Sequence, residues 1–240
     1  MYVSVAVMDT GIFRHMDFDT RIAGFADFVG RKKYLYDDNG HGTHVAGIIA
    51  GSGKGSNGKY RGIAPDTFLV SVKVLDKSGN GKIENVVEAA GWIIENKSAM
   101  NIRVVNISFG TRAKMENGPA IETGEDDYAL IMAVEKMWDS GIVVVAAAGN
   151  NGPGNASVTA PGISKKIITV GAFDDKNFFS GRGPTRECIV KPEVVVTGSN
   201  IIACNNHQGR YSSKSGTSMA APVVSGAVAR LIKNNPDITP

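Results

Sequence analysis

The sequence predicts a single three-layer α/β domain, in which a mostly parallel, twisted sheet carries helices on both faces. Three observations predict this class. Short apolar runs rich in β-branched residues alternate with longer segments of helical periodicity, a pattern typical of parallel sheets with helical crossovers. The chain of 240 residues is long enough for one large core. The sequence contains no internal repeat, low-complexity tract or interdomain linker, so residues 1–240 are interpreted as one domain.

Five buried strands are expected. Each is a short run of mostly apolar residues in which Val and Ile are frequent, as in strands covered on both faces. In chain order they are residues 2–8 (YVSVAVM), 68–75 (FLVSVKVL), 103–107 (RVVNI), 142–147 (IVVVAA) and 167–171 (IITVG).

Four helices are expected between and after these strands. Each segment has apolar residues at intervals of three and four, which places them on one helical face. The last segment is also rich in small residues, which let a helix pack closely against a sheet. In chain order the helices are residues 41–50, 83–96, 128–140 and 218–234.

Composition excludes several classes of partner. The 26 basic and 23 acidic residues leave a net charge of +3, which is too mild to indicate nucleic acid or an anionic membrane surface. No apolar run reaches the roughly 18 residues that a transmembrane helix needs. The first residues, MYVSVAVMD, lack the basic start and cleavage site of a signal peptide. The sequence is compatible with a cytoplasmic or a secreted location.

Four short stretches contain the side chains that acyl transfer through a serine requires. They are VAVMDTGI with Asp9, NGHGTHVAG with His41, VVVAAAGN with Asn150 and SGTSMAAP with Ser218. Together they offer an acid, an imidazole base, an amide donor and a hydroxyl nucleophile. Asp9 and Asn150 follow predicted strands, whereas His41 and Ser218 begin predicted helices. We therefore expect all four at the carboxyl edge of the sheet, where ligands bind in open α/β folds.

Taken singly, these residues have simpler interpretations. An isolated serine at a helix start is usually an N-cap, and an aspartate or asparagine after a strand is usually a turn residue. His44 lies three residues after His41, and HxxH spacing can indicate a metal pair. The third ligand and the accompanying glutamate of a zinc site are absent from the sequence, so His44 is predicted to be a packing residue.

Together, and in the order Asp…His…Ser, the four motifs resemble those of the subtilisin-like serine protease family. The wording of SNGKYRGIAP and KVLDKSGNG is similar to that of bacterial subtilases without a classical secretion signal. The resemblance implies a serine endopeptidase with a triad of Asp9, His41 and Ser218. It also implies that the Asn150 amide and the Ser218 backbone N–H bind the oxyanion, with no organic cofactor.

The resemblance further implies how polypeptide substrates bind. Two backbone edges are expected to pair with an extended chain, and for the second edge a plain glycine-rich turn is the alternative. The walls of the primary specificity pocket are small and mostly apolar, which indicates an apolar or aromatic residue before the cut. The first edge is Ser108, Phe109 and Gly110; the second is Gly79, Asn80 and Gly81; the walls are Ala147, Ala148, Gly149 and Thr159.

Structural calcium is common in this family, and Asp17 matches one of its usual ligands. The matching loop, residues 51–62 (GSGKGSNGKYRG), contains no carboxylate and carries Lys54, Lys59 and Arg61. Calcium requires several oxygen ligands, including carboxylates. The sequence therefore predicts no confident metal site and leaves Asp17 as a possible calcium ligand.

Three further features concern loops, cysteines and chain ends. Residues 111–127 form a long acidic loop that is expected to rim the substrate cleft or to be a solvated surface loop. Spacing leaves a Cys188–Cys204 disulfide open, but the lack of secretory marks favours free thiols. The chain enters its first strand directly and ends on the helix-start signal Thr239-Pro240, so the domain is expected to be trimmed at both ends.

Two other functions use the same residues. A catalytically silent subtilase domain would bind peptides or act as a scaffold, and a small-ester hydrolase would use the triad without a peptide slot. A propeptide or an inhibitor is a further possible partner of the cleft.

Overall fold

The computed structural model describes residues 2–111 and 124–240 of the chain. Its main sheet has seven strands in the order β2-β3-β1-β4-β5-β6-β7, and every neighbouring pair is parallel. The strands are β1 (Ser4–Asp9), β2 (Ile22–Asp27), β3 (Phe68–Lys73), β4 (Ile102–Ile107), β5 (Val143–Ala147), β6 (Ile168–Ala172) and β7 (Val194–Val196). A separate antiparallel hairpin joins β8 (Ile201–Cys204) to β9 (Tyr211–Lys214).

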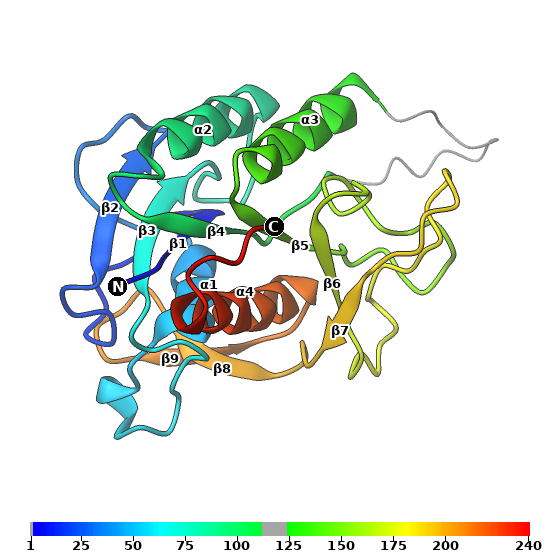
Figure 1. Cartoon of the computed structure of the whole chain (residues 1–240). Helices are drawn as coiled ribbons and strands as arrows, with labels where there is room; N and C mark the ends of the chain where they lie inside the picture. Colours follow the sequence, from blue (N-terminus) through cyan, green and yellow to red (C-terminus); the bar gives the residue numbers. More distant parts are fainter. Residues whose placement is uncertain (1, 112–123) are drawn as a thin grey trace.

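Helices cover both faces of this sheet (Figure 1). On one face lie α1 (His41–Ala50) and α4 (Thr217–Asn234), and on the other lie α2 (Ile83–Asn96) and α3 (Glu125–Asp139). Each face has its own apolar core, because alternate residues of every central strand point to opposite faces. The predicted three-layer α/β class is therefore confirmed. Among the described residues, no helix is long and apolar enough to cross a membrane.

The central strands are buried on both sides, which explains their apolar sequences. All six residues of β1 are buried, and its register pairs Asp9 with Lys73 of β3. The strand predicted to reach residue 75 ends at Lys73, and Leu75 instead forms an isolated antiparallel bridge with Gly81. The other four predicted strands are present, with ends that differ by one or two residues.

Four strands were not predicted. β2 lies at the sheet edge and is mostly half-buried, so its sequence IAGFAD has no continuous apolar run. A Cβ at Gly24 would lie 2.5 Å from the sulfur of Met100, so a larger residue there would require this flexible side chain to move. β7 has only three residues, and β8 and β9 form a short, partly exposed hairpin outside the main sheet.

The start of α3 also corrects the sequence interpretation. Glu125, Asp126 and Asp127 belong to the first turn of this helix, not to the acidic loop. Acidic side chains are favourable there because the N-terminus of a helix carries a partial positive charge. Residues 112–123 of the predicted loop, with Glu116 and Glu122, lie outside the described residues.

A chain of buried polar side chains connects α4 to the sheet. Ser225 of α4 donates to Asn106 Oδ1 of β4 at 2.9 Å, and Asn106 Nδ2 donates to the Ser108 hydroxyl at 2.9 Å. The Ser108 hydroxyl in turn donates to the carbonyl oxygen of Ser218, also at 2.9 Å. Because Ser225, Asn106 and Ser108 are buried, each of these side chains depends on its partner in the series.

We predict that Ser225→Ala lowers the free energy of unfolding by about 1–3 kcal/mol, because Asn106 Oδ1 loses its buried donor. The exposed Ser213→Ala in β9 is the control and should change stability by less than about 0.5 kcal/mol. Urea unfolding with a common slope measures both values. Equal stability of the two variants would contradict the prediction.

Candidate active site

Asp9 and His41 form a hydrogen-bonded pair at the carboxyl edge of the sheet. Asp9 is the last residue of β1 and is fully buried, and His41 is the first residue of α1. His41 Nδ1 lies 2.7 Å from Asp9 Oδ1 and 2.9 Å from Oδ2. The carboxylate can only accept, so the Nδ1 proton is assigned to face it, which leaves Nε2 as an acceptor in the neutral ring. His41 can therefore act as a base through Nε2.

Two opposing effects set the pKa of His41. Burial lowers it, but the negative charge of Asp9 and the hydrogen bond to Asp9 outweigh burial and raise it above the ordinary value of 6.5. Lys214 opposes and Asp37 supports this increase. The pair is therefore suited to stabilise a proton that His41 receives during a reaction.

Gly42 allows α1 to approach the end of β1. A Cβ at this position would lie 2.1 Å from the carbonyl oxygen of Gly11 and 3.0 Å from the Cβ of Asp9. Gly40, the N-cap, has a φ of 97°, a backbone conformation that favours glycine. The two glycines around His41 are thus required by close packing and by backbone geometry.

Asp37 joins the start of α1 to the segment after β1, a role that the sequence analysis missed. Its Oδ1 accepts from the Thr10 hydroxyl at 2.9 Å and from the Asn39 and Gly40 N–H groups. Its Oδ2 accepts from the Thr43 N–H at 3.0 Å and from the Thr43 hydroxyl at 2.5 Å. The sequence contains a signal for this role, because a carboxylate shortly before a helix start can accept hydrogen bonds from the N–H groups of the first turn.

Lys73 is a buried cation beside this network. Its Nζ donates to the carbonyl oxygens of Thr10 at 2.6 Å and Leu75 at 2.9 Å, and it pairs with Asp38 at 2.7 Å. It thereby connects the segment after β1, the segment after β3 and the segment before His41. A lysine inside the apolar run FLVSVKVL was the sequence signal for such a role.

Ser218 is the second residue of α4, and reciprocal hydrogen bonds hold it against Ser108. The Ser218 hydroxyl donates to the Ser108 carbonyl at 2.9 Å, while the Ser108 hydroxyl donates to the Ser218 carbonyl. The contacts described for Ser218 and His41 include no hydrogen bond between these two side chains. α1 begins with His41, α4 begins one residue before Ser218, and these two helices pack against each other.

Asn150 is held in one orientation by the start of α4. Its Oδ1 accepts from the Thr217 N–H at 3.0 Å and from the Thr217 hydroxyl at 3.2 Å. Its amide nitrogen therefore faces away from these donors and can donate to another group. Gly216 leaves space for this amide, because a Cβ there would lie 3.3 Å from Asn150 Nδ2 and φ is 143°.

A cleft of about 1060 Å³ runs beside the Ser108 segment. Its walls include Phe109 and Gly110 on one side and the turn at residues 79–81 on the other. Gly81 is needed in this turn, because a Cβ would lie 2.9 Å from the carbonyl oxygen of Val74. Gly79, Asn80 and Gly81 of one predicted edge and Phe109 and Gly110 of the other thus line one cleft, whereas Ser108 is buried and is not among its described walls.

Of the residues predicted to form the walls of the specificity pocket, some line this cleft and others do not. Thr159 lines the cleft, and its Oγ1 lies 2.5 Å and 2.6 Å from where a Cβ on Gly110 or Gly149 would be. Thr159 thus fills the space between these two glycines. Ala147 and Ala148 are buried and do not belong to the described walls of this cleft, so their place in the specificity pocket stays a prediction.

His44 and the two cysteines make no described side-chain hydrogen bond with Asp9, His41 or Ser218. His44 Nε2 lies 3.1 Å from the Ile201 carbonyl and 3.0 Å from the Ser212 carbonyl, and burial lowers its pKa to about 4. It is therefore a neutral packing residue, as predicted. Cys188 is exposed and Cys204 is buried, and both are free thiols.

Asp17 is fully buried, and its surroundings do not fit a calcium ion. Its carboxylate accepts hydrogen bonds from the Gly53 and Gly55 N–H groups of the loop at residues 51–62. Calcium needs oxygen lone pairs directed at the ion. Here the loop directs the N–H groups of Gly53 and Gly55 towards the carboxylate.

Comparison with known proteins gives relatives along nearly the whole chain. The family model described as the subtilase family matches residues 2–240. Serine protease AprX of Bacillus subtilis (strain 168) is 42% identical over 265 aligned residues, covering 99% of this chain and 58% of AprX. Subtilisin DY of Bacillus licheniformis is 35% identical over 239 residues, covering 99% of this chain and 79% of that protein. The chain thus spans little more than half of AprX.

Solved structures also match this chain along nearly its whole length. A cold adapted subtilisin-like serine proteinase has a TM-score of 0.79 and 32% identity, covering 99% of this chain and 77% of its own. Sphericase has a TM-score of 0.81 and 27% identity, covering 99% of this chain and 79% of its own. The fold expected from the four motifs is therefore confirmed.

We predict that NMR titration of the His41 ring gives a pKa above 6.5 in the wild-type chain. In Asp9→Asn the lowering effect of burial is no longer opposed by the adjacent charge, so this pKa should fall below 6.5. His44, which stays neutral near pH 7, provides the internal control. An unchanged His41 pKa in the variant would show that Asp9 does not control its protonation.

Proposed function

The chain belongs to the subtilase family, and on this basis we propose that it is a serine endopeptidase that cleaves extended polypeptides through an acyl-enzyme. The observation that carries the proposal is the buried Asp9 carboxylate hydrogen-bonded to His41, at the sheet edge where α4 presents Ser218. An acid of this kind orients the imidazole and stabilises its protonated form without taking up the proton.

In the proposed reaction, Ser218 Oγ attacks the carbonyl carbon of the scissile peptide bond as His41 Nε2 takes the hydroxyl proton. The hydroxyl must first leave the Ser108 carbonyl, which a rotation of the side chain accomplishes. His41 then gives the proton to the departing amine. A water molecule, activated by the same base, hydrolyses the acyl-enzyme and regenerates Ser218.

The negative oxygen of the tetrahedral intermediate requires donors that are already in place. We assign this role to the Asn150 amide and the Ser218 backbone N–H. Two features support the assignment. Thr217 holds Asn150 Oδ1, which leaves Nδ2 to donate, and Ser218 lies in the first turn of α4, where backbone N–H groups have no helical acceptor.

Substrate binding is assigned to the cleft between the two backbone edges. A chain that enters as an extra strand can form main-chain hydrogen bonds with residues 79–81 and 108–110, largely independent of its sequence. The same slot suits a propeptide or an inhibitor segment in extended form. Small, mostly apolar residues around Thr159 favour an apolar or aromatic side chain before the cut, with Thr159 limiting the depth available.

A fluorophosphonate probe tests the catalytic assignment, because it forms a covalent bond only with an activated serine. We expect stoichiometric labelling of the wild-type chain, no labelling of Ser218→Ala, and wild-type labelling of the control Ser213→Ala. A folded wild-type chain that is not labelled would exclude the active enzyme. If the unlabelled chain still binds peptides, it is the silent, peptide-binding domain. If the chain is labelled but hydrolyses esters and not peptides, it is an esterase.

The proposed pocket is tested with Thr159→Gly, which joins the space between Gly110 and Gly149 to the cleft. We expect kcat/KM for peptides with Phe before the cut to rise roughly tenfold relative to peptides with Ala. Thr159→Ser keeps the oxygen that fills this space and should change the ratio much less. An unchanged ratio in Thr159→Gly would place the pocket elsewhere.

A further inference from the structure

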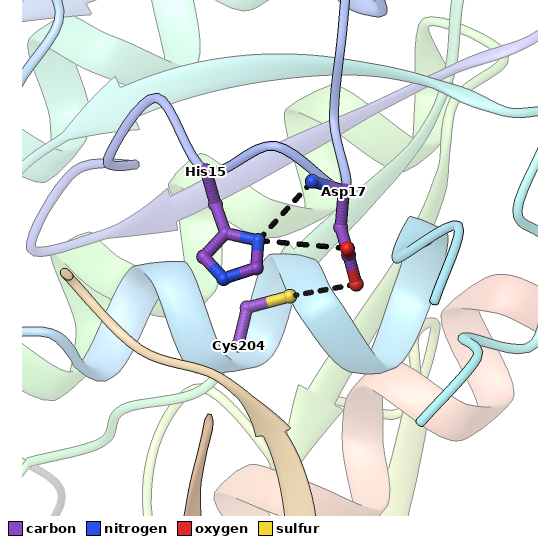
Figure 2. Close-up of side chains that lie close together, drawn as sticks. All are labelled: His15, Asp17 and Cys204. Atoms are coloured by element: carbon purple, nitrogen blue, oxygen red, sulfur yellow. Dashed lines mark hydrogen bonds and ion pairs between the residues drawn. The ribbon is translucent and has the colours of Figure 1, made fainter. Parts of the chain in front are cut away.

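Asp17, in the segment after β1, is the centre of a buried cluster. Its carboxylate accepts from Gly55 N–H at 2.8 Å, Gly53 N–H at 3.1 Å and the Tyr211 hydroxyl at 2.9 and 3.1 Å. The Cys204 thiol lies 3.5 Å from Oδ2 as a fourth donor (Figure 2). Every described hydrogen bond of this carboxylate is therefore with a donor, and His15 Nδ1 lies 3.8 Å from Oδ1, beyond hydrogen-bond distance.

His15 completes the cluster and is also satisfied by hydrogen bonds. Its Nδ1 faces the Asp17 N–H at 3.2 Å, and its Nε2 lies 3.1 Å from the Arg210 carbonyl oxygen. The tautomer assigned from these contacts carries its proton on Nε2 and accepts through Nδ1. His15, Asp17 and Cys204 thus lie together as a metal site would require (Figure 2), but the lone pair of His15 Nδ1 is already used.

The charges around the cluster also disfavour a cation. The Arg21 guanidinium donates to the Asp17 carbonyl oxygen, as well as to Ala50 at 2.8 Å. The loop contributes Lys54, which pairs with Asp19, and no carboxylate. Burial and the nearby Asp17 charge both raise the pKa of the Cys204 thiol, so the sulfur keeps its proton and is not a thiolate ligand.

The segments that meet at Asp17 come from three parts of the chain. They are the segment after β1, the loop at residues 51–62 and the β8–β9 hairpin, which contributes Cys204 and Tyr211. The hairpin lies directly against α1, because a Cβ on Gly47 would be 2.8 Å from the Cys204 nitrogen. Asp17 therefore anchors the layer that supports the helix carrying His41.

We propose that hydrogen-bond donors replace a metal ion at Asp17, so that Gly53, Gly55, Tyr211 and Cys204 hold the loop and the hairpin without calcium. A carboxylate can be stabilised either by a cation or by several N–H and O–H donors. The donors here use its lone pairs, which leaves no oxygen surface for an ion. This inference is independent of the proposed enzymatic activity.

The test uses the accessibility of Cys204 in a Cys188→Ser background, where it is the remaining cysteine. A thiol reagent reports how often the cluster opens, while thermal unfolding reports stability. We expect the same labelling rate and the same midpoint in excess EDTA, in excess CaCl₂ and with ZnCl₂. A midpoint raised by calcium or zinc, or lowered by EDTA, would overturn the proposal.

Two variants test the donors themselves. Tyr211→Phe removes one donor and should lower the thermal midpoint by about 2–4 °C and speed Cys204 labelling. Tyr60→Phe is the matched control, because Tyr60 stacks on Tyr211 while its hydroxyl has no described contact with Asp17. Tyr60→Phe should behave as the parent chain. Equal behaviour of the two variants would show that the Tyr211 hydroxyl does not secure the cluster.

Discussion

The parallel pairing of β1 with β3 and β4 is the constraint on which the rest of the structure depends. It brings the ends of these strands to one edge, where Asp9 lies beside Lys73 and β4 leads directly into Ser108. Parallel strands also require crossover connections, and α1, which returns the chain from that edge, begins with His41. Asp9 and His41, which are 32 positions apart, and Ser108 and Ser218, which are 110 positions apart, are therefore in direct hydrogen-bonding contact.

Burial of charge beside this edge is tolerated because each charged group has several partners. Asp37 is buried but accepts from five donors, and Lys73 is buried but has two carbonyl oxygens and Asp38. Such groups add little stability compared with apolar packing, but removing one partner leaves an uncompensated charge. These charged groups position the end of β1 relative to the start of α1, because hydrogen bonds are directional and apolar contacts are not.

The sequence was informative wherever one local pattern determined the outcome. α1 and α2 have the predicted bounds, and the central strands were found because burial on both faces makes them continuously apolar. β2 was missed because an edge strand needs no such run, and the start of α3 was missed because its acidic residues resemble a loop. The hydrogen bond from Ser218 to Ser108, the hub at Asp37 and the donors around Asp17 depend on side-chain directions across distant segments, which periodicity does not contain.

The series of hydrogen bonds from Ser225 through Asn106 to Ser108 determines how α4 is positioned on the sheet. A helix that is rich in small residues presents a smooth surface, and it could slide or rotate over a flat apolar sheet at little cost in contact area. A shift or rotation of α4 would break at least one of these directional hydrogen bonds and leave a buried polar group without its partner, which costs free energy. These hydrogen bonds thus select one alignment of α4, so substitutions among the surrounding apolar residues can accumulate without moving Ser218.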